Sequence, residues 1–400
     1  MVTLQISHNI ARSLSQNELD CVLKLCPFSA ISSSGGVPAV DAACRMCGVC
    51  VKNGPPGLFS LQESADDTPQ VDKSAWRGIA VYIDQTGGVV HPVSMELLGK
   101  AAELAAKVGF PVYALLIGHG LGEQARELLH YGVDEVFLYD YPELEYFLIE
   151  PYTCVFEDFV RRVKPSSVLV GATPAGRSLA PRLAARLRTG LTADCTKLDI
   201  KENSDLIQIR PAFGGNVMAQ IVTPNHRPQM ATVRYKIFDA PVRSETASGK
   251  ITECSISRNL LASRIIPVEI KKKPPQKSIS DAAVIVAAGR GVKTEKDMSL
   301  VRELAELLDA EVAATRPLTE SGWVAANRQI GLSGRTVKPK LIITLGISGS
   351  VQFKAGMENS DLIISVNTDS NAHIFDVCHY AVRSDLYELV PRLIRLIKEG

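Results

Sequence analysis

Two short apolar runs near the end of the chain constrain its fold most. They span Leu341–Leu345 and Leu362–Val366, which is the length of a strand and too short for a helix. Continuous apolar runs of this kind are typical of parallel strands buried on both faces. The first run ends in the turn Gly346–Ser350 and the second in Asn367. Ligands of open α/β sheets bind at the carboxyl ends of strands, and the N–H groups and hydroxyls of such a turn suit a phosphate.

Three further motifs combine glycine, arginine and hydroxyl residues in the same region. They are Gly289-Arg290-Gly291 after the run Val284–Ala288, Thr315-Arg316-Pro317, and Gln329–Arg335 (QIGLSGR). With these motifs in this order, residues 280–397 resemble the FAD-binding domain of the alpha subunit of electron transfer flavoproteins. The resemblance continues upstream through residues 171–200 and 210–235. Several long motifs in the family's order are more specific than a single glycine turn.

The resemblance implies a set of residues that contact FAD. We expect the phosphates or the ring edge at Arg290, the phosphates and ribityl chain at the turn Ser348–Ser350, and the adenosine half near Asn367 and Asp385. The full set carried over from the family is Arg290, Thr315, Arg316, Ile330, Gly331, Leu332, Ser333, Ser348, Gly349, Ser350, Val351, Gln352, Phe353, Asn367, Asp385 and Leu386.

Residues expected near the flavin ring decide its redox properties. Thr315 stands where the family has a small hydroxyl residue, and Ser333 stands where it usually has Thr and can donate toward flavin N5. Arg316 is the catalytic residue that we expect, in the sense that it tunes the redox potential, because a cation near the ring stabilises the negative charge of its reduced forms. Phe353 stands where the family commonly has a His that donates to the flavin C2 carbonyl. Further departures are Leu332 for Gln and Thr368 for Lys. We expect FAD binding to survive these changes, whereas they put the redox potentials of the ring in doubt.

A cysteine pattern near the start of the chain indicates an iron–sulfur domain. Cys44, Cys47 and Cys50 have the C-x2-C-x2-C spacing of bacterial ferredoxins, in which a C-x3-C-P step follows and its cysteine ligates the other cluster. Here Gly54 replaces that cysteine, while Cys26-Pro27 keeps the equivalent step of the first half. We therefore expect one [4Fe–4S] cluster on Cys26, Cys44, Cys47 and Cys50. A zinc knuckle and a domain without metal remain the alternatives.

Three positions where the lost cluster would have had ligands carry other residues. They are Gln16, Leu19 and Val22. Cys21 is one residue out of register with this pattern. We therefore expect its thiol to be packed in the domain and not to be a ligand.

Composition limits the partners and the compartment. The chain has 44 basic and 43 acidic residues, so its charge gives no reason to expect nucleic acid or an anionic membrane surface. No apolar run approaches the roughly 18 residues of a membrane helix, and the N-terminus does not resemble a signal peptide. Nine cysteines, three of them clustered, favour metal or redox chemistry in a reducing compartment, which we take to be the cytoplasm.

The middle of the chain alternates predicted strands with helices. Strands are expected at Gly78–Ile83, Pro111–Ile117, Val133–Tyr139 and Ser167–Val170, with helices at Ser94–Val108, Glu157–Val163 and Ala172–Arg188. This alternation is typical of a doubly wound α/β domain. We expect three domains: an α+β ferredoxin-like domain (1–65), an α/β domain that pairs with a beta subunit (66–270), and a Rossmann-like FAD-binding domain (271–400). The Lys/Pro run Lys271–Pro275 is expected to be the hinge between the last two.

The resemblance also implies a function. The family's alpha subunit pairs with a beta subunit, and its FAD passes single electrons to a flavin-dependent dehydrogenase, here one acting on an acyl-CoA or a 2-hydroxyacid. An N-terminal ferredoxin domain resembles the electron-bifurcating members, in which NADH supplies one electron to the dehydrogenase and one to ferredoxin. We expect an electron-transfer subunit of an oxidoreductase complex, with no acid or nucleophile among its side chains. The alternatives are a non-bifurcating carrier with a vestigial cluster domain and a non-redox nucleotide-binding subunit.

Overall fold

A computed structural model describes residues 2–41, 44, 46–63, 71–212, 217–271 and 278–399. The chain divides into two compact units, Met1–Gln70 and Val71–Gly400. The predicted boundaries near residues 65 and 271 lie at segments outside the described residues, so they stay predictions. Within the described residues, no helix is both long and apolar enough to span a membrane.

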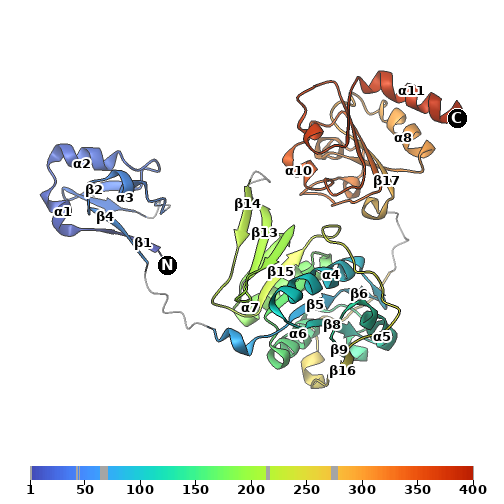
Figure 1. Cartoon of the computed structure of the whole chain (residues 1–400), viewed down its shortest axis with the longest axis horizontal. Helices are drawn as coiled ribbons and strands as arrows, with labels where there is room; N and C mark the ends of the chain where they lie inside the picture. Colours follow the sequence, from blue (N-terminus) through green and yellow to red (C-terminus); the bar gives the residue numbers. More distant parts are fainter. Residues whose placement is uncertain are drawn as a thin grey trace. The chain divides into compact units, whose positions relative to one another are not determined.

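The N-terminal unit is a small α+β structure (Figure 1). Its outer strands pair antiparallel and its inner strands form a hairpin. The helix Gln16–Leu23 begins with a capping box, in which Ser15 and Glu18 satisfy each other's backbone N–H groups. The elements are β1 (Val2–Ile6), α1 (His8–Ser13), α2 (Gln16–Leu23), β2 (Ile31–Ser34), β3 (Val37–Val40), α3 (Val49–Asn53) and β4 (Phe59–Glu63).

A seven-stranded sheet forms the centre of the second unit, in the order β11-β15-β10-β5-β8-β9-β16. Every neighbouring pair is parallel. Helices α4 and α5 cover one face and helices α6 and α7 the other, and each face has its own apolar core. The strands are β5 (Ile79–Ile83), β8 (Val112–Gly118), β9 (Glu135–Asp140), β10 (Ser167–Gly171), β11 (Leu191–Cys195), β15 (Gln229–Val233) and β16 (Lys250–Glu253); the helices are α4 (Pro92–Val108), α5 (Gly122–Leu128), α6 (Ile149–Val163) and α7 (Pro174–Leu187).

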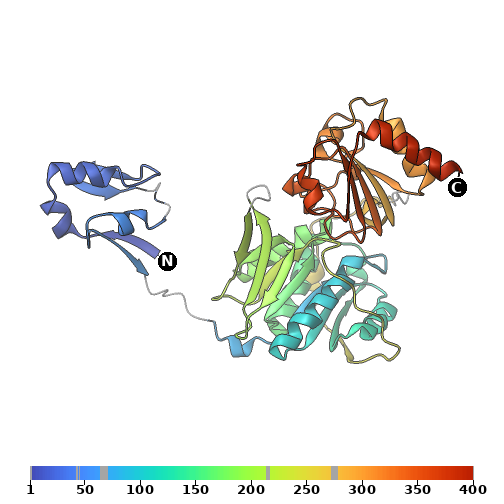
Figure 2. The ribbon, with the colours of Figure 1, turned by 45° about the horizontal axis from the view of Figure 1, so that its top comes forward.

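A three-stranded antiparallel sheet follows the strand β11. It consists of β12 (Lys197–Ile200), β13 (Leu206–Ala212) and β14 (Val217–Ile221), with β13 in the middle. Figure 2 shows these strands as a separate yellow-green layer from the parallel sheet.

The C-terminal part contains a parallel sheet in the order β18-β17-β19-β20-β21. The chain leaves β17 toward one edge and later continues from β19 toward the other, so the strand order reverses between β17 and β19. Helices α8 and α11 pack on one face, and the segment that follows β19 packs on the other. The elements are β17 (Val284–Ala288), α8 (Met298–Leu307), β18 (Glu311–Ala314), α9 (Arg316–Glu320), β19 (Leu341–Leu345), α10 (Val351–Lys354), β20 (Ile363–Asn367), β21 (Tyr380–Arg383) and α11 (Leu386–Glu399).

The predicted fold class is confirmed, with local differences. The helix expected at Glu157–Val163 begins earlier, at Ile149. The stretch 240–280, where no periodic pattern predicts structure, contributes β16 as an edge strand beside β9. A four-residue strand at an edge has one neighbour and half-exposed side chains, so it leaves little hydrophobic signal. Of the expected hinge, residues 272–275 lie outside the described part of the chain.

Candidate functional site

The loops after β17 and β19 meet where the strand order reverses, which is where open α/β sheets bind ligands. Gly291 N donates to Gly346 O over 2.9 Å. A Cβ on Gly291 would lie 2.5 Å from Gly346 Cα, and Gly346 itself has a φ of +61°. Only glycine permits this approach, so the glycine turns predicted from sequence form the floor of a cavity of about 720 Å³.

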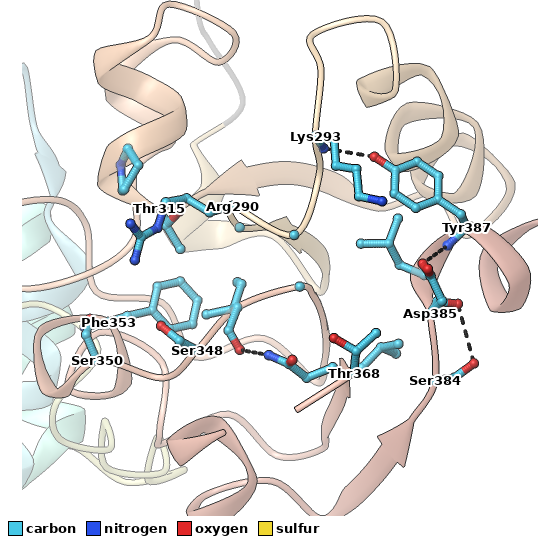
Figure 3. Close-up of a pocket in the computed structure, with 18 residues that line it drawn as sticks. Arg290, Lys293, Thr315, Ser348, Ser350, Phe353, Thr368, Ser384, Asp385 and Tyr387 are labelled. Atoms are coloured by element: carbon cyan, nitrogen blue, oxygen red, sulfur yellow. Dashed lines mark hydrogen bonds between the residues drawn. The ribbon is translucent and has the colours of Figure 1, made fainter. Parts of the chain in front are cut away.

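Two cations, Arg290 and Lys293, line this cavity. Neither Arg290 nor Lys293 forms an ion pair within the described part of the chain. The Lys293 ammonium lies 5.3 Å from the centroid of the Tyr387 ring, and Figure 3 shows both side chains at the same end of the cavity. Tyr387 accepts a hydrogen bond from Lys293 N (2.8 Å) and donates one to Asp297 (2.7 Å). The pair of cations gives the cavity the charge that a pyrophosphate needs.

A second cavity of about 520 Å³ adjoins the first. The two share four lining residues, namely Thr315, Pro317, Ser350 and Phe353. The Thr315 hydroxyl is buried and has no hydrogen-bond partner in the described part of the chain, which is costly unless a ligand supplies one. A long ligand with a charged middle and a polar group near Thr315 fits this pair of cavities.

The predicted adenosine contacts differ in how free their side chains are. Asn367 donates to Ile347 O (2.8 Å) and accepts from Asp369 N (3.0 Å), so its amide mainly braces the two loops. Asp385 accepts from Tyr387 N with one carboxylate oxygen (2.9 Å). Asp385 is therefore the better placed of the two to accept hydrogen bonds from ribose hydroxyls.

Arg316 lines the second cavity and is paired within its own helix. Its Nε donates to Glu320 Oε1 over 2.8 Å, across one turn of α9. Both side chains are well exposed, at 66% and 60%. An exposed pair of this kind is weak, so the guanidinium can swing toward a ligand at little cost.

The two cavities together gather all the predicted FAD contacts except Gly349 and Val351. Gly349 has a φ of +83°, and a Cβ there would meet Ile374 N at 2.0 Å, so its role is to make the turn. Val351 lies on another cavity and is 41% exposed. The expected contacts were taken from whole motifs of the family. The set therefore includes positions that form the turn as well as positions that line a cavity.

Three lining residues of the first cavity were missed by the sequence analysis, namely Lys293, Ser384 and Tyr387. Other lining residues belong to motifs or departures that it described but not to the expected FAD contacts; they are Gly289, Gly291, Pro317, Gly346, Ile347, Val366 and Thr368. Lys293 lies shortly after the turn that contains Arg290, so the sequence could have indicated it as a second cation of this cavity. Tyr387 had no such signal, because only the fold brings α11 next to that turn.

The four expected cluster ligands line one small cavity in the N-terminal unit. Cys26, Cys44, Cys47 and Cys50 surround it together with Pro27, Phe28 and Met46. Ala30 N donates to Cys26 Sγ over 3.4 Å, as backbone N–H groups do to cluster sulfurs. Burial, with smaller contributions from Cys44 and Cys47, raises the pKa of the Cys50 thiol.

Among the described residues, no three His, Cys, Asp or Glu side chains lie close enough together to hold a metal ion.

The prediction that Cys21 is a packed thiol is wrong. Cys21 is exposed. Its neighbours Leu19 and Val22, at two positions of the lost cluster ligands, are buried on the core side of α2. Because helix neighbours point in different directions, Cys21 is left facing solvent.

Comparisons with known proteins agree with the geometry. A family model described as "Electron transfer flavoprotein domain" matches residues 79–259, and one described as "Electron transfer flavoprotein FAD-binding domain" matches residues 278–358. An electron transfer flavoprotein subunit alpha of Clostridium acetobutylicum is 43% identical over 333 residues, which cover 82% of this chain and 99% of the relative. The chain belongs to the electron transfer flavoprotein alpha-subunit family.

Another relative of this alpha subunit matches nearly end to end. It is "Lactate dehydrogenase (NAD(+),ferredoxin) subunit LctC" of Acetobacterium woodii, 55% identical over 389 residues, which cover 97% of this chain and 93% of that protein. A match of that length includes most of the N-terminal unit. The match to the Clostridium relative leaves 18% of this chain uncovered, although it spans almost the whole of that relative.

Proposed function

We propose that this protein holds FAD across the two cavities and carries single electrons between a beta subunit and a flavin-dependent dehydrogenase. The observation that carries the proposal is the join between the cavities, where the buried Thr315 hydroxyl lacks a partner among the described residues. Arg290, which lines the first cavity, forms no ion pair with any of these residues either. FAD supplies reversible electron uptake when bound. Arg290, Lys293 and the Ser348–Ser350 turn bind its pyrophosphate, Asp385 orients the adenosine, and Arg316, Ser333 and Phe353 surround the ring.

FAD content tests this proposal against the non-redox alternative. Purified protein should be yellow and contain one FAD per chain. Arg290→Ala should weaken FAD binding by at least tenfold, measured by flavin fluorescence on titration, because it removes a cation from the phosphate end. Arg302→Ala is the matched control, since Arg302 lies on α8 and lines neither cavity. A colourless protein that binds AMP would contradict the proposal.

We further propose that the N-terminal unit carries one [4Fe–4S] cluster on Cys26, Cys44, Cys47 and Cys50. The support is the convergence of all four thiols on one cavity with an N–H donor to one sulfur. A cubane is ligated at four separate irons, so its thiolates stand farther apart than those of one zinc ion. Anaerobic protein should contain about four irons per chain. Cys47→Ala should lose them, whereas Cys21→Ala, the matched control on an exposed thiol, should not.

The proposed complex is an electron-bifurcating one that uses NADH and ferredoxin. The support is the match over 97% of the chain to a subunit whose name contains NAD(+), ferredoxin and lactate dehydrogenase. The dehydrogenase partner would then act on a 2-hydroxyacid. Purification of the native complex with mass spectrometry of its subunits tests this. An iron-free complex that oxidises NADH without reducing ferredoxin would favour a non-bifurcating carrier with a vestigial cluster domain.

A further inference from the structure

A chain of hydrogen bonds links α9 to the loop that carries Ser333. Thr319 Oγ1 lies 2.7 Å from Gln329 Oε1, and Gln329 Nε2 lies 2.8 Å from Ser333 Oγ. Thr319 Oγ1 is also 2.8 Å from Arg316 O. Ser333 lines the second cavity, while Gln329 is 9% exposed and lies behind it. A buried amide therefore holds the hydroxyl that faces the cavity.

These hydrogen bonds can be arranged in two ways, and in each way every bond has one donor and one acceptor. Thr319 has one hydroxyl proton but two acceptors within reach. In the first arrangement, Thr319 donates to Gln329 Oε1 and Gln329 Nε2 donates to Ser333. The Ser333 hydroxyl can then donate its own proton to a ligand in the cavity. In the second, Thr319 donates to Arg316 O and the Gln329 amide is turned over. Its nitrogen then donates to Thr319, its oxygen accepts from Ser333, and Ser333 presents only a lone pair to the cavity.

The backbone around Gln329 is held by hydrogen bonds, so the two arrangements differ in the orientation of the Gln329 amide and of the two hydroxyl protons and not in the course of the backbone. Arg335 N donates to Gln329 O (2.8 Å), and Ile330 N donates to Ala314 O (3.0 Å). Among the described residues, no other group accepts the Ser333 proton. Intermediate positions of the amide leave buried donors unpaired, which is unfavourable.

We propose that Gln329 is a positioning residue that sets whether Ser333 donates a hydrogen bond into the flavin cavity. The inference rests on the proposed function, because it requires the flavin ring beside Ser333. A hydroxyl that donates to the ring stabilises the charge that an electron brings, so the first arrangement favours reduction. The amide thereby acts on the ring only through Ser333.

Two substitutions of Gln329 separate this role from a structural one. Gln329→Glu provides acceptors only, so it captures the Ser333 proton and should make one-electron reduction at least tenfold less favourable, about 59 mV. Part of that change comes from the added charge, and the same substitution in a Ser333→Ala background measures that part alone. Gln329→Met removes both partners, leaves the Ser333 proton for the ring, and should not lower the potential.

The measurement is an anaerobic reductive titration of the FAD-loaded protein, with thermal unfolding recorded for each variant. The inference predicts a larger fall for Gln329→Glu when Ser333 is present than when it is absent. Equal falls in both backgrounds, or a Ser333-dependent fall with Gln329→Met, would overturn the inference alone. Unmodified protein that binds no FAD would instead overturn the proposed function.

Discussion

Phe353 is the residue at which this chain departs most from the family pattern in the ring environment. It is 3% exposed, lines both cavities, and packs in the apolar core beneath them. A phenyl ring donates no hydrogen bond, so the flavin carbonyl expected there lacks a donor that would stabilise added charge. One hydrogen bond to a charged group contributes about 1.5–3 kcal/mol.

Phe353→His should therefore make one-electron reduction of the bound flavin easier by roughly ten- to a hundredfold, about 60–120 mV. The midpoint potential from an anaerobic titration measures the shift. Phe353→Leu, which also lacks a donor, is the control and should leave the potential near its original value. An unchanged potential for the His variant with FAD still bound would place the carbonyl elsewhere.

Arg316 should act on the potential more than on FAD affinity. Its guanidinium borders the second cavity and is free to leave the exposed Glu320 carboxylate. Arg316→Ala removes a cation from the ring end, so the flavin should become harder to reduce while FAD content stays close to normal. Arg302→Ala again controls for loss of a positive charge. A potential that does not move would show that Arg316 is not beside the ring.

At the scale of elements, burial decides which parts of the fold the sequence predicts. The strands β17 and β19 match the apolar runs Val284–Ala288 and Leu341–Leu345 residue for residue, because both faces of each are covered. The edge strand β16 pairs with one neighbour, and the single turn α10 is held by one N-cap, so neither produces a periodic pattern in the sequence. In the site, sequence motifs predicted the loops, but the Lys293–Tyr387 pair depends on the packing of α11 and was not predictable.

The helix α4 carries a carboxyl group that should make stability depend on pH. Glu96 is 7% exposed and accepts hydrogen bonds from Lys236 N (3.0 and 3.2 Å). Burial raises the pKa of Glu96 to about 7 from 4.5, although the N–H donors oppose the shift. The folded state thus binds this proton more tightly than the unfolded state, and stability is lost as pH rises from about 5 through 7.

Glu96→Gln should remove that loss, which amounts to roughly 3 kcal/mol for this group. Thermal unfolding of both proteins between pH 5 and 8 measures it. The original protein should lose stability relative to the variant over this range. Parallel pH profiles would show that Glu96 is ionised throughout, held by the Lys236 N–H group.

The whole molecule consists of two compact units with separate cores, so iron and flavin should be lost independently. Cys50, one of the proposed ligands, is part of the small N-terminal core, and metal bound by the folded state only adds directly to stability. Cys47→Ala should therefore remove the iron and lower the temperature of one unfolding transition. FAD content, the flavin potential and the transition of residues 71–400 should stay unchanged. Calorimetry with iron and flavin assays measures all four quantities, and the exposed Cys21→Ala serves as the control. Loss of FAD together with iron would mean that the two units depend on each other for folding, contrary to their separate cores.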